Sequence, residues 1–135
     1  MNISLANNTI LITGGAGFIG SNFIPSFLEQ NPDVDILNLD KLTYAADLEH
    51  LKEVENNERY NFIEGDICDS DLVQTIFNDH NVRVVIHFAA ESHVDNSIDR
   101  PDTFIETNIR GTFTLLEAAR SFWFDAGNKL KEGFE

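Results

Sequence analysis

The residues with the clearest chemical potential form a glycine-rich segment near the start of the sequence. Thr13–Gly20 reads Thr-Gly-Gly-Ala-Gly-Phe-Ile-Gly, in which Gly15, Gly17 and Gly20 have the spacing G-x-G-x-x-G. Between a strand and a helix, such a segment binds a pyrophosphate through backbone N–H groups and the positive end of the helix dipole. In this motif the first glycine permits a sharp turn, the second lets the backbone approach the pyrophosphate, and the third lets helix and strand pack closely.

Asp40 ends the next apolar run, 20 residues after Gly20. An acid at this separation accepts hydrogen bonds from the ribose hydroxyls of adenosine, and its charge repels the 2′-phosphate of NADP. The positive charge of Lys41 next to it acts against this preference. The glycine segment and the acid together predict an NAD site. The alternative interpretation is that they form only a tight turn and a solvated acid at the end of a strand. An ATP-binding Walker loop is excluded, because Ser21-Asn22 stands where that loop needs Lys and Ser or Thr.

The composition limits the possible partners. The net charge is −14, whereas nucleic acids and anionic membranes are bound by clustered Lys and Arg, so neither is expected. Cys68 is the single cysteine and cannot form an internal disulfide, which favours the cytoplasm. We expect it to be a small buried residue rather than a catalytic thiol. We also expect no signal peptide and no membrane span.

Apolar runs and helical patterns alternate along the chain. Strands are predicted at residues 9–13, 35–40, 61–64 and 83–88. Helices are predicted at 18–30 with a kink at Pro25, within 47–57, at 70–79 with Ser70 as N-cap, and from Pro101 to about Ala126 with Gly127 as the stop. The predicted fold class is α/β: one NAD-binding Rossmann domain over residues 1–135, an incomplete doubly wound parallel sheet whose four strands are ordered 3-2-1-4.

Further polar residues follow the third and fourth predicted strands, at the edge where open parallel sheets bind ligands. Ala89–Ala90 are small enough for a flat cofactor to lie against the backbone. His87 is predicted to be a hydrogen-bonded core residue, and His93 either a substrate contact or a loop residue. A metal site at His87, Glu91 and His93 is not expected, because no further ligand joins them.

Five blocks carry a specific resemblance. The chain resembles the N-terminal part of the dTDP-glucose 4,6-dehydratases, a branch of the extended short-chain dehydrogenase/reductase family. The first block is common to that superfamily, whereas the second and fourth favour nucleotide-sugar dehydratases, including the UDP-N-acetylglucosamine branch. The blocks are Thr13–Gly20, Asp40–Ala45, Gly65–Asp69, His87–Asp95, and Phe104–Asn108 continuing to Gly111-Thr112.

The resemblance implies NAD as cofactor, a nucleotide-sugar substrate, and a homodimer paired through the last helix. It places the chain in nucleotide-sugar metabolism, including dTDP-rhamnose biosynthesis. It implies that Ser92 and His93 contact the sugar and that Asn108 supports the active-site helix. The implied cofactor-binding residues are Gly14, Gly15, Gly17, Phe18, Ile19, Gly20, Asp40, Lys41, Leu42, Thr43, Asp66, Ile67, Phe88, Ala89, Ala90, Glu91, Ser92 and Thr107.

The resemblance also implies chemistry for which these 135 residues carry no catalytic group. Enzymes of this family oxidise the sugar at C4, eliminate water across C5 and C6 and return the hydride to C6, with a tyrosine base followed four residues later by a lysine. Leu48 follows Tyr44 and Glu64 follows Tyr60 at that distance, and there is no other tyrosine. The Thr-Asp-Glu segment for elimination is missing too. We expect this polypeptide to bind NAD weakly or moderately without turnover. We expect its strand at 83–88, as an unpaired edge, to cause self-association or poor solubility.

Three other interpretations remain open from the sequence. The chain could be the cofactor-binding part of a UDP-sugar 4-epimerase or of a UDP-N-acetylglucosamine dehydratase. It could be a stand-alone, non-catalytic NAD-binding module. It could also be a purely structural domain, which would not bind NAD.

Overall fold

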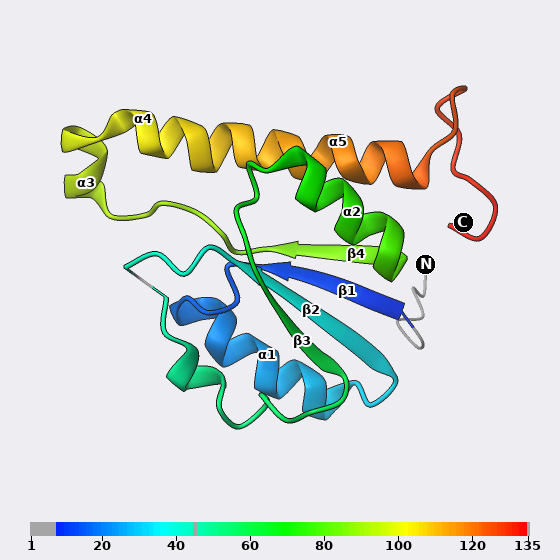
Figure 1. Cartoon of the computed structure of the whole chain (residues 1–135), viewed down its shortest axis with the longest axis horizontal. Coiled ribbons are helices and arrows are strands. Elements are labelled where there is room, and N and C mark those ends of the chain that lie inside the picture. The colour runs from blue at the N-terminus through cyan, green and yellow to red at the C-terminus, as the bar shows by residue number, and fades with distance from the viewer. Residues whose placement is uncertain (1–7, 45, 135) are drawn as a thin grey trace. The chain divides into compact units, whose positions relative to one another are not determined.

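The computed structural model describes residues 8–44 and 46–134 (Figure 1). Contacts divide the chain into two compact units. The first contains the residues up to Asp66 together with Val82–Ala89, and the second contains Ile67–Asn81 and the residues from Ala90 onward. All four strands of the described chain belong to the first unit.

The first unit is built on a parallel sheet. β1 (Asn8–Thr13) pairs with β2 (Val34–Asp40) on one side and with β4 (Val82–His87) on the other, and β2 also pairs with β3 (Tyr60–Glu64). The order among the described residues is β3-β2-β1-β4, which confirms the predicted order. The order reverses beside β1, so the carboxyl end of β1 is the position at which open α/β sheets bind ligands.

Helix α1 (Phe18–Gln30) supplies the apolar cover of this sheet within the first unit. Ile24 and Leu28 on α1 join Ile10, Ile12 and other strand residues in one buried cluster. Complete burial of such a side chain contributes roughly 1.5–3 kcal/mol, so a few of them suffice to hold the helix in place. α1 runs through Pro25 as a single element.

Arg59 connects the end of α1 to the start of β3. Its guanidinium donates to the carbonyl oxygens of Leu28, Asn31 and Val34 at 2.9–3.1 Å. The last carbonyls of a helix have no partner within the helix, and Arg59 satisfies that of Leu28. The segment predicted to be helical within 47–57 forms one 3₁₀ turn, η1 (Leu48–Leu51), capped by the carboxylate of Asp47.

The second unit contains α2 (Ser70–His80) packed against α5 (Thr112–Trp123). Phe77 of α2 is fully buried and contacts Phe122 and the ring of Trp123. The predicted N-cap, Ser70, is wrong by one residue. Asp69 caps the helix, because its extended backbone lets its carboxylate accept from the N–H of Leu72 at 3.0 Å.

The long helix predicted from Pro101 to Ala126 differs from the structure in three ways. An additional helix, α3 (Val94–Asp99), precedes it. A π-helical segment, η2 (Ile105–Gly111), separates α4 (Pro101–Phe104) from α5. The end comes at Trp123 rather than near Gly127, because the carboxylate of Asp125 accepts from two later backbone N–H groups and forms a turn.

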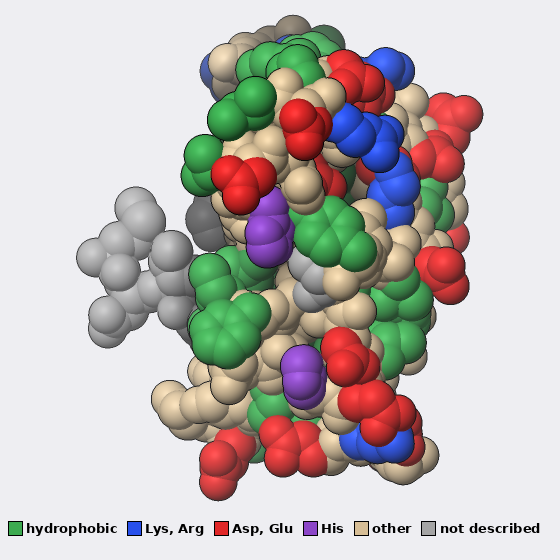
Figure 2. Space-filling view, turned by 90° about the vertical axis from the view of Figure 1, so that its left-hand side faces the viewer, with side chains coloured by type: hydrophobic (Ala, Val, Ile, Leu, Met, Phe, Trp, Pro, Cys, Tyr) green, Lys and Arg blue, Asp and Glu red, His purple; other side chains and the backbone are tan. Residues whose placement is uncertain are grey.

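No helix among the described residues is long and apolar enough to cross a membrane. Acidic side chains are spread over the face shown in Figure 2, as the net charge of −14 leads one to expect.

Candidate functional site

The turn between β1 and α1 is held by the strands on both sides of it. Gly14 has a φ of 71°, and its N–H donates to the carbonyl of Leu39 at 3.0 Å. A Cβ on Gly14 would lie 2.4 Å from the backbone nitrogen of Ala89. The positive φ therefore falls on Gly14 rather than on Gly15, the first glycine of the motif.

Hydrogen bonds inside the turn occupy three consecutive backbone N–H groups. Gly15 donates to the side-chain oxygen of Asn38 at 3.1 Å, Ala16 to Asp40 at 2.9 Å, and Gly17 to the carbonyl of Gly14 at 3.2 Å. The bond from Ser21 to the carbonyl of Gly17 begins the helical pattern. The N–H groups before it, those of residues 18–20, lie at the positive end of α1, where an anion is stabilised.

The outer side of this turn is open. A Cβ on Gly17 would meet one neighbour within 4 Å, the carbonyl oxygen of Gly14 at 3.3 Å. The side chains of Phe18 and Ile19 are 83% and 64% exposed. Gly20, by contrast, is buried against the backbone of Gly14 and Gly15. A ligand could therefore approach the backbone at Gly17–Ile19, while Gly20 provides close packing.

The Asp40 carboxylate connects the glycine turn to the segment after β2. Asp40 is only 8% exposed; one carboxylate oxygen accepts from the N–H of Ala16 and the other from the N–H of Leu42, each at 2.9 Å. Leu42 has a φ of 53°, so this bond holds a left-handed residue just after β2. Each carboxylate oxygen has two lone pairs, so Asp40 can still accept hydrogen bonds from a ligand.

Lys41 and Asp66 form an ion pair at the carboxyl ends of β2 and β3. The Lys41 side chain is 61% exposed and that of Asp66 32%. A pair this exposed contributes at most about 1 kcal/mol to stability, but it locates both charges beside Asp40. Thr43 is exposed in the loop that follows; Ala45, in the same sequence block, lies outside the described residues.

The end of β4 is bound to the end of β1. The N–H of Phe88 donates to the carbonyl of Thr13 at 2.9 Å, and the Thr13 hydroxyl lies 2.6 Å from Nδ1 of His87. The predicted hydrogen bond of His87 is confirmed, but the prediction of a core position is wrong, because His87 is exposed. Ala89 is half-buried, and its backbone lies directly beside Gly14.

The ring of His87 gives a prediction for pH dependence. Although much of His87 is exposed, its ring is partly buried where it contacts Thr13, and this desolvation lowers the pKa of His87 below its usual value. The unfolded chain therefore binds this proton at higher pH than the folded chain. The stability from this ring is fully present above about pH 6.5 and is lost as the pH falls from there through the lower folded-state pKa. We expect His87→Gln to lose less free energy of unfolding than the wild type between about pH 7.5 and 5.5 in urea titrations. Equal losses of free energy of unfolding in the wild type and in His87→Gln would contradict this. His50→Gln, at an exposed position, is the control.

In the second unit, Asn108 holds the segment that contains Glu91 and Ser92. Its side-chain oxygen accepts from the N–H of Glu91 at 2.8 Å, and its side-chain nitrogen donates to the carbonyl of Glu91 at 2.9 Å. Glu91 is half-buried, whereas Ala90, Ser92 and His93 are exposed. Thr107 is half-buried, adjacent to Asn108 in η2.

Two predicted residues of the second unit are packed against its helices. Ile67 is 4% exposed, and a Cβ on Gly111 would lie 2.4 Å from its Cδ1, so the side chain of Ile67 is packed against η2. Cys68 is half-buried rather than buried as predicted, and its Sγ donates to the carbonyl of Glu106 at 3.3 Å.

Asn38 and Tyr60 are site residues that sequence reasoning missed. Asn38 is fully buried, accepts from Gly15, and donates to the Tyr60 hydroxyl at 3.0 Å. Burial raises the pKa of Tyr60 above its usual value. The available signal was the single amide inside the apolar run Ile36–Leu39.

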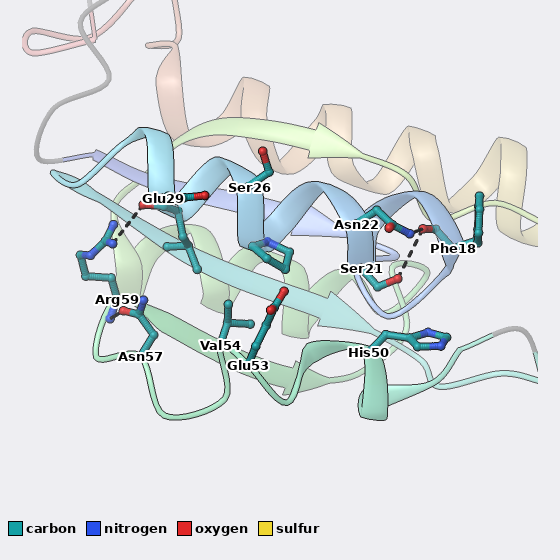
Figure 3. A pocket seen from close by; sticks show the side chains of 12 residues that line it. Phe18, Ser21, Asn22, Ser26, Glu29, His50, Glu53, Val54, Asn57 and Arg59 are labelled. Carbon is teal, nitrogen blue, oxygen red and sulfur yellow. Dashed lines mark hydrogen bonds between the residues drawn. The ribbon is translucent and has the colours of Figure 1, made fainter.

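A cavity of about 810 Å³ lies between α1 and the segment from His50 to Arg59 (Figure 3). The carboxylates of Glu29 and Glu53 line it, and the Arg59 guanidinium is already bound to backbone carbonyls. This charge disfavours a diphosphate, so the N–H groups of the turn are the better anion site.

Comparisons with known proteins agree with this site. The family model described as GDP-mannose 4,6 dehydratase matches residues 11–131. A dTDP-glucose 4,6-dehydratase of Escherichia coli is 52% identical over 93% of this chain and 34% of its own length. The chain thus spans about a third of the length of such relatives.

Solved structures show the same fold. The dTDP-glucose 4,6-dehydratase DesIV of Streptomyces venezuelae, crystallised with NAD and TYD, matches with a TM-score of 0.79 and 44% identity over 84% of this chain and 36% of that one. A UDP-glucose 4-epimerase of Thermotoga maritima, crystallised with UDP-glucose, matches with a TM-score of 0.74 and 33% identity over 84% of this chain and 34% of that one. The predicted α/β Rossmann-like fold is confirmed, and by its match over most of its length the chain belongs to the GDP-mannose 4,6-dehydratase family of enzymes.

Proposed function

We propose that this chain is the NAD-binding portion of a dTDP-glucose 4,6-dehydratase, and that its described residues form one cofactor-binding domain. The observation that supports it most is the turn after β1, where the backbone at Gly17–Ile19 is open to a ligand and the Asp40 carboxylate binds the neighbouring Ala16. The chain is 44% identical to the dTDP-glucose 4,6-dehydratase DesIV but 30% and 33% identical to the UDP-glucose 4-epimerases of Brucella ovis and Thermotoga maritima, which favours the dehydratase branch.

NAD is favoured over NADP by the charges around Asp40. The Asp40 carboxylate repels a 2′-phosphate. Lys41, the cation next to it in the sequence, is paired with Asp66. The relative DesIV, to which the chain is 44% identical, was crystallised with NAD.

Each part of the site would have its own task. The backbone of Phe18 and Ile19 would bind the pyrophosphate, and Asp40 would accept from the ribose hydroxyls. NAD, when bound, supplies the hydride acceptor for oxidation of the sugar. Asn108, through the peptide of Glu91, would position Ser92 and His93 toward a nucleotide sugar.

Calorimetry and an activity assay on the purified 135-residue polypeptide test this proposal together. We expect NAD to bind, NADP to bind at least about tenfold more weakly, and dTDP-glucose with NAD to give no 4-keto-6-deoxy product. The sequence carries no Tyr-x-x-x-Lys pair to act as base. Absence of NAD binding by the folded chain would overturn the cofactor site, and product formation would overturn the predicted lack of turnover.

We further propose that the protein is a cytoplasmic homodimer. The supporting observation for the dimer is a set of exposed apolar residues at helical intervals of four, four and three along η2 and α5, namely Ile105, Ile109, Phe113 and Leu116, each 57–64% exposed. An exposed apolar stripe is typical of an interaction surface, and along a helix it can pack against its own copy across a two-fold axis. The single cysteine supports the reducing compartment.

The stripe predicts the effect of a charge on α5. We expect Phe113→Glu to shift the chain from dimer to monomer in sedimentation velocity, because the dimer would bury a carboxylate without a partner. Ser121→Glu, an exposed position on the same helix outside these intervals, should remain dimeric. If Phe113→Glu stays dimeric, association uses another surface, and the exposed edge of β4 is then the next candidate.

A further inference from the structure

We propose that Asn38 is a positioning residue for the pyrophosphate-binding turn, and that Tyr60 holds Asn38 in place. This inference rests on the proposed NAD function. It adds two residues of β2 and β3 that would not touch the cofactor but would determine how the N–H groups of the turn are presented to it.

The position of Asn38 in the sheet supports this role. Ile36, Asn38 and Asp40 alternate along β2 and therefore project from the same face of the strand. Ile36 belongs to the buried cluster with α1, while Asn38 and Asp40 accept from Gly15 and Ala16 in the turn. β2 thus binds two consecutive peptide groups of the turn through side chains two residues apart.

Space for this contact exists because residue 15 is glycine. A Cβ there would lie 2.2 Å from the Asn38 side-chain oxygen. The short approach and the hydrogen bond fix the orientation of the Gly15 peptide. Because Ala16 is fixed by Asp40, the chain leaves the turn in one direction, and the N–H groups of Phe18 and Ile19 come to the open side.

The hydrogen bond that Asn38 accepts from the turn explains the buried amide at this position. Asn38 is fully buried, and a leucine of similar size would fill the site without the cost of desolvating an amide. Only a polar side chain can accept the N–H of Gly15, which otherwise would be a buried donor without a partner.

Tyr60 completes the arrangement. Asn38 donates from its side-chain nitrogen to the Tyr60 hydroxyl at 3.0 Å, which directs the amide oxygen toward Gly15. Among the described residues, no buried side-chain polar atom lacks a partner, so this network is complete. Removing the Tyr60 hydroxyl would leave the Asn38 amide in place but free it to rotate.

The experiment compares ligands with and without a diphosphate. Wild type, Asn38→Leu and Tyr60→Phe are titrated with NAD, ADP and adenosine by calorimetry or NMR. We expect Asn38→Leu to weaken NAD and ADP binding by about tenfold and adenosine binding by less than about twofold. Tyr60→Phe should weaken the same two ligands by about two- to threefold and shift the Gly15 amide resonance. Asn61→Leu, an exposed site on β3, is the matched control.

The outcomes separate the two proposals. If the wild type binds neither NAD nor ADP, the proposed function fails. If the wild type binds both and folded Asn38→Leu binds them equally well, or loses adenosine to the same degree, the positioning role fails. Should Asn38→Leu not fold, Tyr60→Phe decides: unchanged affinities for NAD and ADP overturn the inference.

Discussion

Gly14→Ala is expected to lower the free energy of unfolding by about 2–5 kcal/mol, from backbone strain and from a steric clash together. A side chain at a φ of 71° is strained, and its Cβ would lie 2.4 Å from the backbone nitrogen of Ala89. Backbone atoms cannot rotate away as a flexible side chain can, so β1 and β4 would have to separate. Urea unfolding followed by circular dichroism measures the loss.

Gly17→Ala is the matched control for Gly14→Ala. Gly17 has an extended conformation that alanine adopts without strain, and its Cβ would meet only the carbonyl oxygen of Gly14 at 3.3 Å. The cost in stability should stay below about 1 kcal/mol. NAD affinity should nevertheless fall, because the added methyl group lies on the open side of the turn. Equal destabilisation by the two substitutions would contradict these separate roles.

Asp40→Ala should weaken NAD binding by about 100-fold or more, the largest expected effect on the cofactor. The substitution removes the proposed ribose acceptor and, in addition, leaves the N–H groups of Ala16 and Leu42 without their partner. A simple loss of affinity therefore cannot show that Asp40 touches the ribose. Calorimetry with NAD gives the overall effect, and an unchanged affinity would contradict the site.

A second comparison isolates the ribose contact of Asp40. Wild type should bind ADP more tightly than 2′-deoxy-ADP, because only ADP offers the 2′-hydroxyl to the carboxylate. Asp40→Asn keeps the shape and one acceptor oxygen, so it should hold the turn better than alanine while discriminating less between the two ligands. If the wild type and Asp40→Asn prefer ADP over 2′-deoxy-ADP to the same degree, Asp40 stabilises the turn and does not contact the ribose.

The ion pair between Lys41 and Asp66 changes how the cofactor preference is understood. On the sequence, Lys41 weakened the argument for NAD, because a cation beside Asp40 could attract a 2′-phosphate. In the structure its charge is paired with Asp66, which follows β3 and lies 25 residues away along the chain. A pair between two strand ends requires the sheet order, which residue types alone do not contain.

Local patterns were sufficient for much of the fold. The apolar runs and the glycine segment indicated four strands, the helix after Gly17 and the order 3-2-1-4, and the structure confirms them. Alternating strands and helices with right-handed connections allow few strand orders, so local sequence patterns were enough to predict this one. Helix boundaries were predicted less accurately, because the N-cap of α2 at Asp69 and the end of α5 at Trp123 depend on individual side-chain hydrogen bonds.

The sequence by itself determined that this chain is an α/β domain with a glycine turn and an acid placed for a dinucleotide, because spacing along a strand and a helix follows from local geometry. Only the tertiary structure decided how the turn is held. Asn38 and Asp40 reach it from β2, Tyr60 on β3 holds Asn38, and the glycine with the positive φ, Gly14, is the one that Ala89 after β4 approaches most closely. Hydrogen bonds and close contacts between distant segments form only when the sheet is assembled, so no local pattern records them.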